Sequence, residues 1–194
     1  MNNADIINFF DRFAPTWDES QVRNEVVIET ILHNGGIRAG IDVLDVACGT
    51  GVLFPDYLKR GVASLTGIDI SPAMAEIARR KFPEVEVICG DVTVTNIDRQ
   101  FDVIMVYNAF PHFPDPAGVI EVLASLCKPG GRLSIAHGMS REALHAHHSQ
   151  GASTVSLPLP EAEELAKLLA VHFDVDVVIS NEEMYQVSGV KKQR

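Results

Sequence analysis

The stretch VLDVACGTGVLFPDYL, residues 43–58, decides the fold, because it has the pattern of a buried strand, a turn of small residues and then a helix. Glycines at 49 and 51 let the backbone turn sharply at the carboxyl end of the strand, where open α/β sheets bind ligands. A dinucleotide fingerprint would need a third glycine where the chain has Phe54. Asp45, before the turn, would oppose a pyrophosphate. The pattern predicts a nucleotide-type site for a ligand with positive charge.

Strand-like and helix-like segments alternate along the rest of the chain. Near-continuous apolar strands separated by helices indicate a mostly parallel sheet that is covered on both faces. The last segments, VDVVIS and MYQVSGVK, are separated only by NEE, which is too short for a parallel crossover. We therefore predict a doubly wound α/β fold, with a seven-stranded sheet that ends in an antiparallel hairpin. The other strand candidates are residues 64–70, 85–91, 101–108 and 131–138.

Composition excludes several classes of function. A formal net charge of −10 argues against nucleic-acid binding, which needs a concentrated Lys/Arg surface. No apolar run approaches the roughly 20 residues of a membrane span, so no membrane insertion is expected. Cys48, Cys89 and Cys127 lack CxxC spacing and are interpreted as reduced thiols. With no secretory signal pattern, these features predict a cytoplasmic protein, and none of them indicates an oligomeric state.

Two further acids follow Asp45, each at the end of a predicted strand. Asp69, in LTGIDIS, lies 24 positions after Asp45, and Asp91 follows in ICGDV. A carboxylate at the position of Asp69 can accept hydrogen bonds from both hydroxyls of a ribose. Helix capping is the alternative role for acids at strand ends.

These motifs occur in an order that resembles the class I S-adenosylmethionine-dependent methyltransferases, close to the ubiquinone- and menaquinone-biosynthesis-like group that acts on small molecules. The resemblance covers about residues 40–138 and rests on LDVACGTG, GIDIS, GDV, FDVIMVYNAFPHF and LCKPGGRL. It implies a Rossmann-like fold, S-adenosylmethionine as cofactor and a small-molecule methyl acceptor. An NAD-binding module and a non-catalytic cofactor-sensing or metal-binding protein remain as alternatives.

The resemblance assigns roles to individual residues. Ala47, often glycine in the family, would line the methionine moiety with Gly49 and Gly51, while Asp45 would order the loop. Asn108 would lie near the methionine amino group and the reactive methyl. Ribose would be held by Asp69, and adenine by Asp91 with Val92; Cys48 and Ile70 complete the expected cofactor-binding set.

The acceptor side is less specified by sequence. We expect a single domain over residues 1–194, with 1–36 as an N-terminal helical lid and 139–160 as an acceptor-side insertion. Phe10, Phe13 and Trp17 would cover the cofactor or acceptor, or would simply pack in the core. Phe113, in the loop after the fourth strand, is expected to contact the substrate together with Trp17.

Histidines supply the candidate bases. His112 and His137 follow the fourth and fifth strands, and an imidazole with a pKa of about 6.5 suits a general base. His145 and His148 would share one helix face if Ser140 caps a helix there, and could line the acceptor site. A metal site built from His112, His137, His145 and His148 is the minority alternative, and a solvated helix face is a third.

Overall fold

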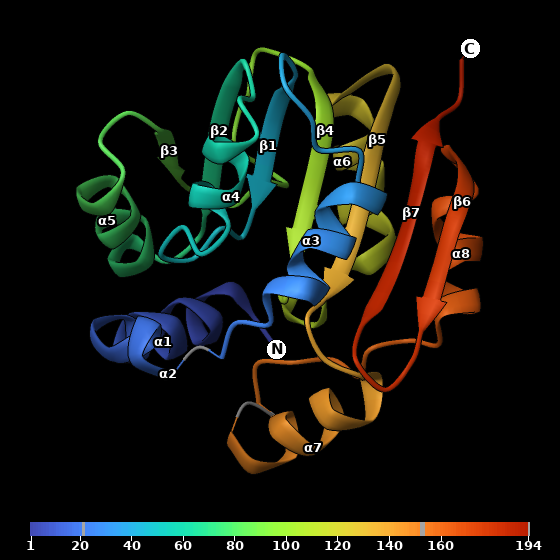
Figure 1. Ribbon diagram of the computed structural model, residues 1–194. Helices are drawn as coiled ribbons and strands as arrows, with labels where there is room; N and C mark the ends of the chain where they lie inside the picture. Colours follow the sequence, from blue (N-terminus) through green and yellow to red (C-terminus); the bar gives the residue numbers. More distant parts are fainter. Residues whose placement is uncertain (21, 152–153, 194) are drawn as a thin grey trace.

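In the part of the chain that the computed structural model describes, residues 1–20, 22–151 and 154–193, seven strands form one sheet (Figure 1). The side chains of residues 20 and 147–151 lie outside this description. The strand order is β3-β2-β1-β4-β5-β7-β6, in which β7 is antiparallel to both neighbours and all other pairs are parallel. The predicted doubly wound α/β fold is confirmed. The strands are β1 (Asp42–Val46), β2 (Ser64–Asp69), β3 (Glu86–Cys89), β4 (Phe101–Tyr107), β5 (Cys127–His137), β6 (Phe173–Ser180) and β7 (Tyr185–Lys191).

Helices cover both faces of this sheet. Helices α3, α4 and α5 pack on one face, and α6 and α8 pack on the other. The α-helices are α1 (Asn3–Phe13), α2 (Trp17–Ser20), α3 (Glu25–Asn34), α4 (Phe54–Lys59), α5 (Pro72–Lys81), α6 (Pro116–Leu126), α7 (Arg141–Gly151) and α8 (Ala162–Leu169). Two short 3₁₀ helices are η1 (Ala14–Thr16) and η2 (Phe110–His112).

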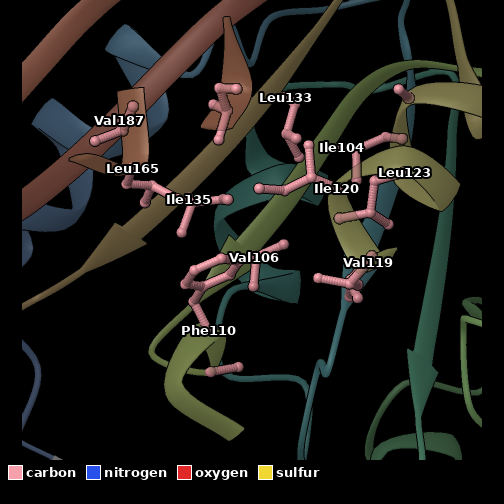
Figure 2. Close-up of a cluster of buried hydrophobic side chains, with 14 of the residues drawn as sticks. Ile104, Val106, Phe110, Val119, Ile120, Leu123, Leu133, Ile135, Leu165 and Val187 are labelled. Carbon is pink, nitrogen blue, oxygen red and sulfur yellow. The ribbon is translucent and has the colours of Figure 1, made fainter. Parts of the chain in front are cut away.

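The apolar strands are explained by burial on both faces. In β1, Val43 belongs to the core beneath α3, α4 and α5, whereas Leu44 belongs to the core beneath α6 and α8. Figure 2 shows the second core, where Ile104 of β4 lies among α6 side chains that include Ile120 and Leu123. Each fully buried side chain of this kind contributes about 1.5–3 kcal/mol. This two-sided burial fixes the strand ends on which the functional site is built.

Capping residues set the starts of the helices that follow the strand ends. The Ser71 hydroxyl accepts a hydrogen bond from Met74 N at 3.1 Å, with Pro72 in the first turn of α5. The Ser140 hydroxyl accepts from Ala143 N at 3.1 Å, so the conditional prediction of a capped helix there is confirmed.

The C-terminal hairpin is also confirmed. Strands β6 and β7 pair antiparallel, and Asn181 Oδ1 accepts from Glu183 N and Met184 N in the turn. β7 lies between β5 and β6 and pairs antiparallel with both, so it extends the sheet beside β5 as well as forming the hairpin. The KPGG segment, residues 128–131, lies within β5 directly after α6, and the register between β4 and β5 shifts there.

The N-terminal region divides into two parts. Helix α3 packs on the sheet through Val27, Ile28 and Ile31, whereas α1 contacts α5 beyond the sheet edge (Figure 1). Within the predicted lid, residues 1–36, α3 is therefore packed on the sheet, whereas α1 is not. The single-domain division and the insertion at 139–160 stay predictions. Among the described residues, no helix is both long and apolar enough to cross a membrane.

Candidate functional site

A cavity of about 250 Å³ lies at the carboxyl edge of the sheet, between the strand ends and the N-terminal helices. We call the strand-end side the floor and the opposite side the roof. The floor consists of Ala47, Cys48, Gly49, Asp69, Ile70, Asp91, Val92 and Asn108. The roof consists of Asn3, Ile6, Phe10, Trp17, His112 and Phe113. The cavity thus contains eight of the ten residues predicted to bind cofactor, together with Trp17, His112 and Phe113.

Asp69 fastens the glycine turn to the end of β2. Its Oδ2 accepts from Gly49 N at 2.7 Å, and its Oδ1 accepts from Ser71 N at 2.8 Å. Burial raises the pKa of Asp69 to about 6, although these two bonds favour the ionised form. Each carboxylate oxygen has a further lone pair, so the same group can also accept from the hydroxyls of a ribose.

Asp45 and Gly51 lie behind the turn and do not line the cavity. Asp45 is 2% exposed, and burial, followed by the charge of Asp69, raises its pKa well above the ordinary value. A direct bond to the backbone of the glycine turn is made by Asp69, and the loop-ordering role of Asp45 stays a prediction. Gly51 has φ +82°, and a Cβ there would lie 2.7 Å from the ring of Phe54. Gly51 therefore allows the turn to pack closely on α4.

Strained backbone occurs at two floor residues. Ala47 and Asn108 have φ of 55° and 54°, and among the described residues no other non-glycine residue has a positive φ. This conformation costs about 1–2 kcal/mol for a residue with a side chain. Asn108 is held in place because its Oδ1 accepts from Gly138 N at 2.9 Å. Such strain is concentrated where a structure positions groups for function.

Polar contacts join the roof segments to the floor. Asn3 Nδ2 donates to Asp91 Oδ2 at 2.7 Å, while Asp91 Oδ1 accepts from Thr93 N at 2.8 Å. Asp18 Oδ1 accepts from the Thr50 hydroxyl, inside the glycine turn, at 2.5 Å. The N-terminal helices are therefore attached at both predicted ends of the cofactor site.

Three more contacts are made by acids of the N-terminal helices. Asp11 Oδ1 accepts from the Ser71 hydroxyl at 2.6 Å, and Lys81 Nζ donates to Asp18 Oδ2 at 2.7 Å. Asp11 also accepts from Ala73 N at 3.1 Å, at the start of α5. A negative side chain is favourable at this helix N-terminus.

His112 is the titratable base of the roof. Its Nδ1 lies 2.8 Å from Val155 O, and its ring packs edge-on against Phe10 with centroids 5.0 Å apart. Burial lowers the pKa of His112, so the imidazole is neutral at neutral pH. Phe10 also packs edge-on against Trp17 at 5.6 Å. Phe10 and Trp17 thus line the cavity and also pack against each other. Phe13 is 39% exposed and does not line the cavity.

The other candidate histidines lie away from the cavity lining. His137 is 0% exposed and packs edge-on against Tyr185, its register partner on β7, at 6.0 Å. His145 lies on α7 and is partly buried. His112 lines the cavity and His137 does not, since His137 is buried where the last residues of β5 pair with β7. The side chain of His148 lies outside the described residues.

The described residues contain no group of three or more His, Cys, Asp or Glu that could hold a metal ion. Since His148 falls outside this description, the four-histidine metal site stays a prediction. Sequence reasoning missed Tyr107, which lines the cavity next to Asn108, and the Val155–Ser156 contact with His112. Tyr107 could have been found from its place at the end of a predicted strand, but position 155 carries no local signal.

Comparison with known proteins agrees with this geometry. Residues 43–131 match the family described as a methyltransferase domain. The chain is 35% identical over 125 residues to a ubiquinone biosynthesis O-methyltransferase from Alkalilimnicola ehrlichii, which covers 61% of this chain and 49% of that protein. It is 31% identical over 157 residues to a malonyl-[acyl-carrier protein] O-methyltransferase from Priestia megaterium, covering 76% and 57%.

The chain is therefore similar to the class I S-adenosylmethionine-dependent methyltransferases. It spans about half the length of the first of these relatives. Its fold is similar to that of magnesium protoporphyrin IX methyltransferase from Synechocystis, solved with bound S-adenosylhomocysteine (SAH), at a TM-score of 0.74 and 18% identity. That match covers 98% of this chain and 100% of the other, and it shows the fold alone.

Proposed function

We propose that the protein transfers a methyl group from S-adenosylmethionine to a small-molecule acceptor. The observation that carries the proposal is the floor, where the turn at Gly49 is bonded to Asp69 and opens into the same cavity as Asp91 and Asn108. Asp69 would hold the ribose hydroxyls, Asp91 and Val92 would contact adenine, and Asn108 would lie near the methionine end. Ala47, Cys48, Gly49 and Ile70 complete the cofactor-binding surface.

The charge of the cavity favours this ligand. Among the described residues that line it, the charged side chains are Asp69, Asp91 and Asp115, with no Lys or Arg. Carboxylates in a partly enclosed site favour a cation such as a sulfonium and disfavour an anion. The acceptor is therefore proposed to carry no negative charge, and the aromatic residues of the roof suit a flat, apolar molecule.

Once S-adenosylmethionine and the acceptor are aligned, the protein has few chemical groups to contribute to the transfer itself. When bound, S-adenosylmethionine supplies a methyl carbon that bonds to the acceptor's lone pair as the carbon–sulfur bond breaks and leaves its electrons on sulfur. The floor and roof would align the two reactants for this in-line transfer and exclude water. His112 receives the proton that a hydroxyl or thiol acceptor loses and later releases it to water. Both relatives described above are O-methyltransferases, which favours an oxygen acceptor.

A cytoplasmic location is part of the proposal and is supported by three cysteines without disulfides. His137 as a second base and His145 as an acceptor contact are not adopted, because neither lines the cavity. No role is assigned to His148.

Methyl-labelled S-adenosylmethionine tests the proposal directly. The protein is incubated with phenols, quinols and thiols, each paired with a carboxylate on the same ring. Label in the neutral member of a pair supports the proposal, whereas saturable SAH binding without transfer to any acceptor favours a cofactor sensor.

A further inference from the structure

We propose that the segment Val155–Leu157, after α7, positions His112 as the base by fixing which ring nitrogen carries the proton. This inference rests on the proposed function, because it describes how the base of that reaction is oriented. The segment is separated from His112 by more than 40 positions, and no motif predicts their contact.

The protonation pattern follows from the partner of Nδ1. Val155 O lies 2.8 Å from His112 Nδ1, and a carbonyl oxygen can only accept a hydrogen bond. Nδ1 therefore carries the proton in the neutral ring, and Nε2 carries the lone pair that takes a proton from the acceptor. The Ser156 hydroxyl is 3.2 Å from the same nitrogen, so it is the weaker of the two partners.

Backbone and side-chain contacts hold this segment in place. Leu157 N donates to Pro111 O at 2.7 Å, which joins the segment to η2 one residue before His112. Val155 is 2% exposed and forms a small core with Ile6, against which Phe10 packs. The buried side chain of Val155 therefore anchors the residue whose carbonyl contacts His112, and Phe10 packs against both this small core and the His112 ring.

The arrangement follows the general logic of an oriented base. A base is efficient when a third group fixes its direction and tautomer, because the lone pair must point at the proton to be removed. A displacement of about 1 Å in such a group lowers the rate about 10²-fold. Val155 thus acts through His112 and is a positioning residue.

Nitrogen-15 NMR of histidine-labelled protein at pH 8 tests the tautomer without any activity measurement. The His112 signals are assigned by their loss in His112→Gln. We expect the shift of a protonated nitrogen at Nδ1 and of an unprotonated nitrogen at Nε2, unchanged in Ser156→Ala. A proton on Nε2 in the wild-type protein would overturn the inference, whatever the outcome of the transfer assay.

The rate test uses two adjacent glycine substitutions. Val155→Gly removes the buried anchor, whereas Thr154→Gly loosens the neighbouring backbone at an exposed position. Val155→Gly is expected to lower kcat about 10²-fold, with SAH affinity within about twofold of wild type, and Thr154→Gly to stay close to wild type. Equal kcat values for the two variants would contradict the proposal. If Val155→Gly does not fold, the tautomer measured in the wild type and in Ser156→Ala decides the question.

Discussion

The floor and the roof of the cavity are built in different ways. The floor comes from strand ends and is fixed by bonds to backbone groups, such as those from Gly49 N and Ser71 N to Asp69. The roof combines α1, α2, η2 and the segment at Val155, which are far apart in sequence and meet through aromatic packing and backbone contacts. From this difference we expect cofactor binding to depend on the local geometry of the strand ends, and acceptor chemistry to depend on tertiary packing.

The largest expected effect is a loss of kcat on removal of the proposed base, which separates the role of the roof from that of the floor. His112→Ala is expected to lower kcat about 10²–10⁴-fold, because proton removal by a positioned base contributes that much. SAH affinity should stay within about twofold, since the floor is intact. His33→Ala, on the exposed side of α3, serves as the matched control. A parallel loss of SAH affinity and rate would show that the roof is not independent of the floor.

The second prediction concerns a substitution in the floor that should weaken cofactor binding. Asp69→Ala removes the proposed ribose acceptor and the bonds to Gly49 N and Ser71 N. The expected cost to SAH binding is about 1–3 kcal/mol, measured by calorimetry. Asp98→Ala, at an exposed loop position, should bind as wild type. Unchanged affinity in Asp69→Ala would remove the central residue of the proposed cofactor site.

Gly138 tests how tightly the end of the floor is packed. A Cβ at this position would lie 2.3 Å from the Tyr107 hydroxyl and 3.3 Å from Cζ of the same ring. Gly138→Ala is therefore expected to lower the free energy of unfolding by about 1–3 kcal/mol. Tyr107→Phe in the same chain removes the overlapping oxygen and should restore most of that loss. A double variant no more stable than Gly138→Ala would show that the strain lies elsewhere.

The smallest effect concerns pH. In the proposed site the ribose is held by ionised Asp69, whose pKa is raised to about 6, so we expect SAH affinity at pH 5 to be about tenfold below its plateau at higher pH. Without ligand the sign is reversed: the raised pKa means that Asp69 adds stability as the pH falls from about 6 towards 3.8. Both trends should disappear in Asp69→Asn. A flat SAH profile in the wild type would argue against ionised Asp69 as the ribose ligand.

The contrast between floor and roof also explains which features could be predicted from the sequence. The turn at Gly49, the acid at Asp69 and the hairpin follow from local pattern, so fold and floor were predictable. The place of His137 outside the cavity lining does not follow from local pattern, because its burial depends on the pairing of β5 with β7, which is a matter of sheet order. The contact of Val155 with His112 could not be predicted, because it is made by a backbone carbonyl and every residue type has one.

Equilibrium dialysis against SAH and against NAD tests the central claim most directly, because it asks which ligand the floor was built to hold. We predict saturable binding of one SAH per chain and no binding of NAD at the same concentrations. Binding of NAD in preference to SAH would contradict the account and would identify the turn at Gly49 as part of a dinucleotide site.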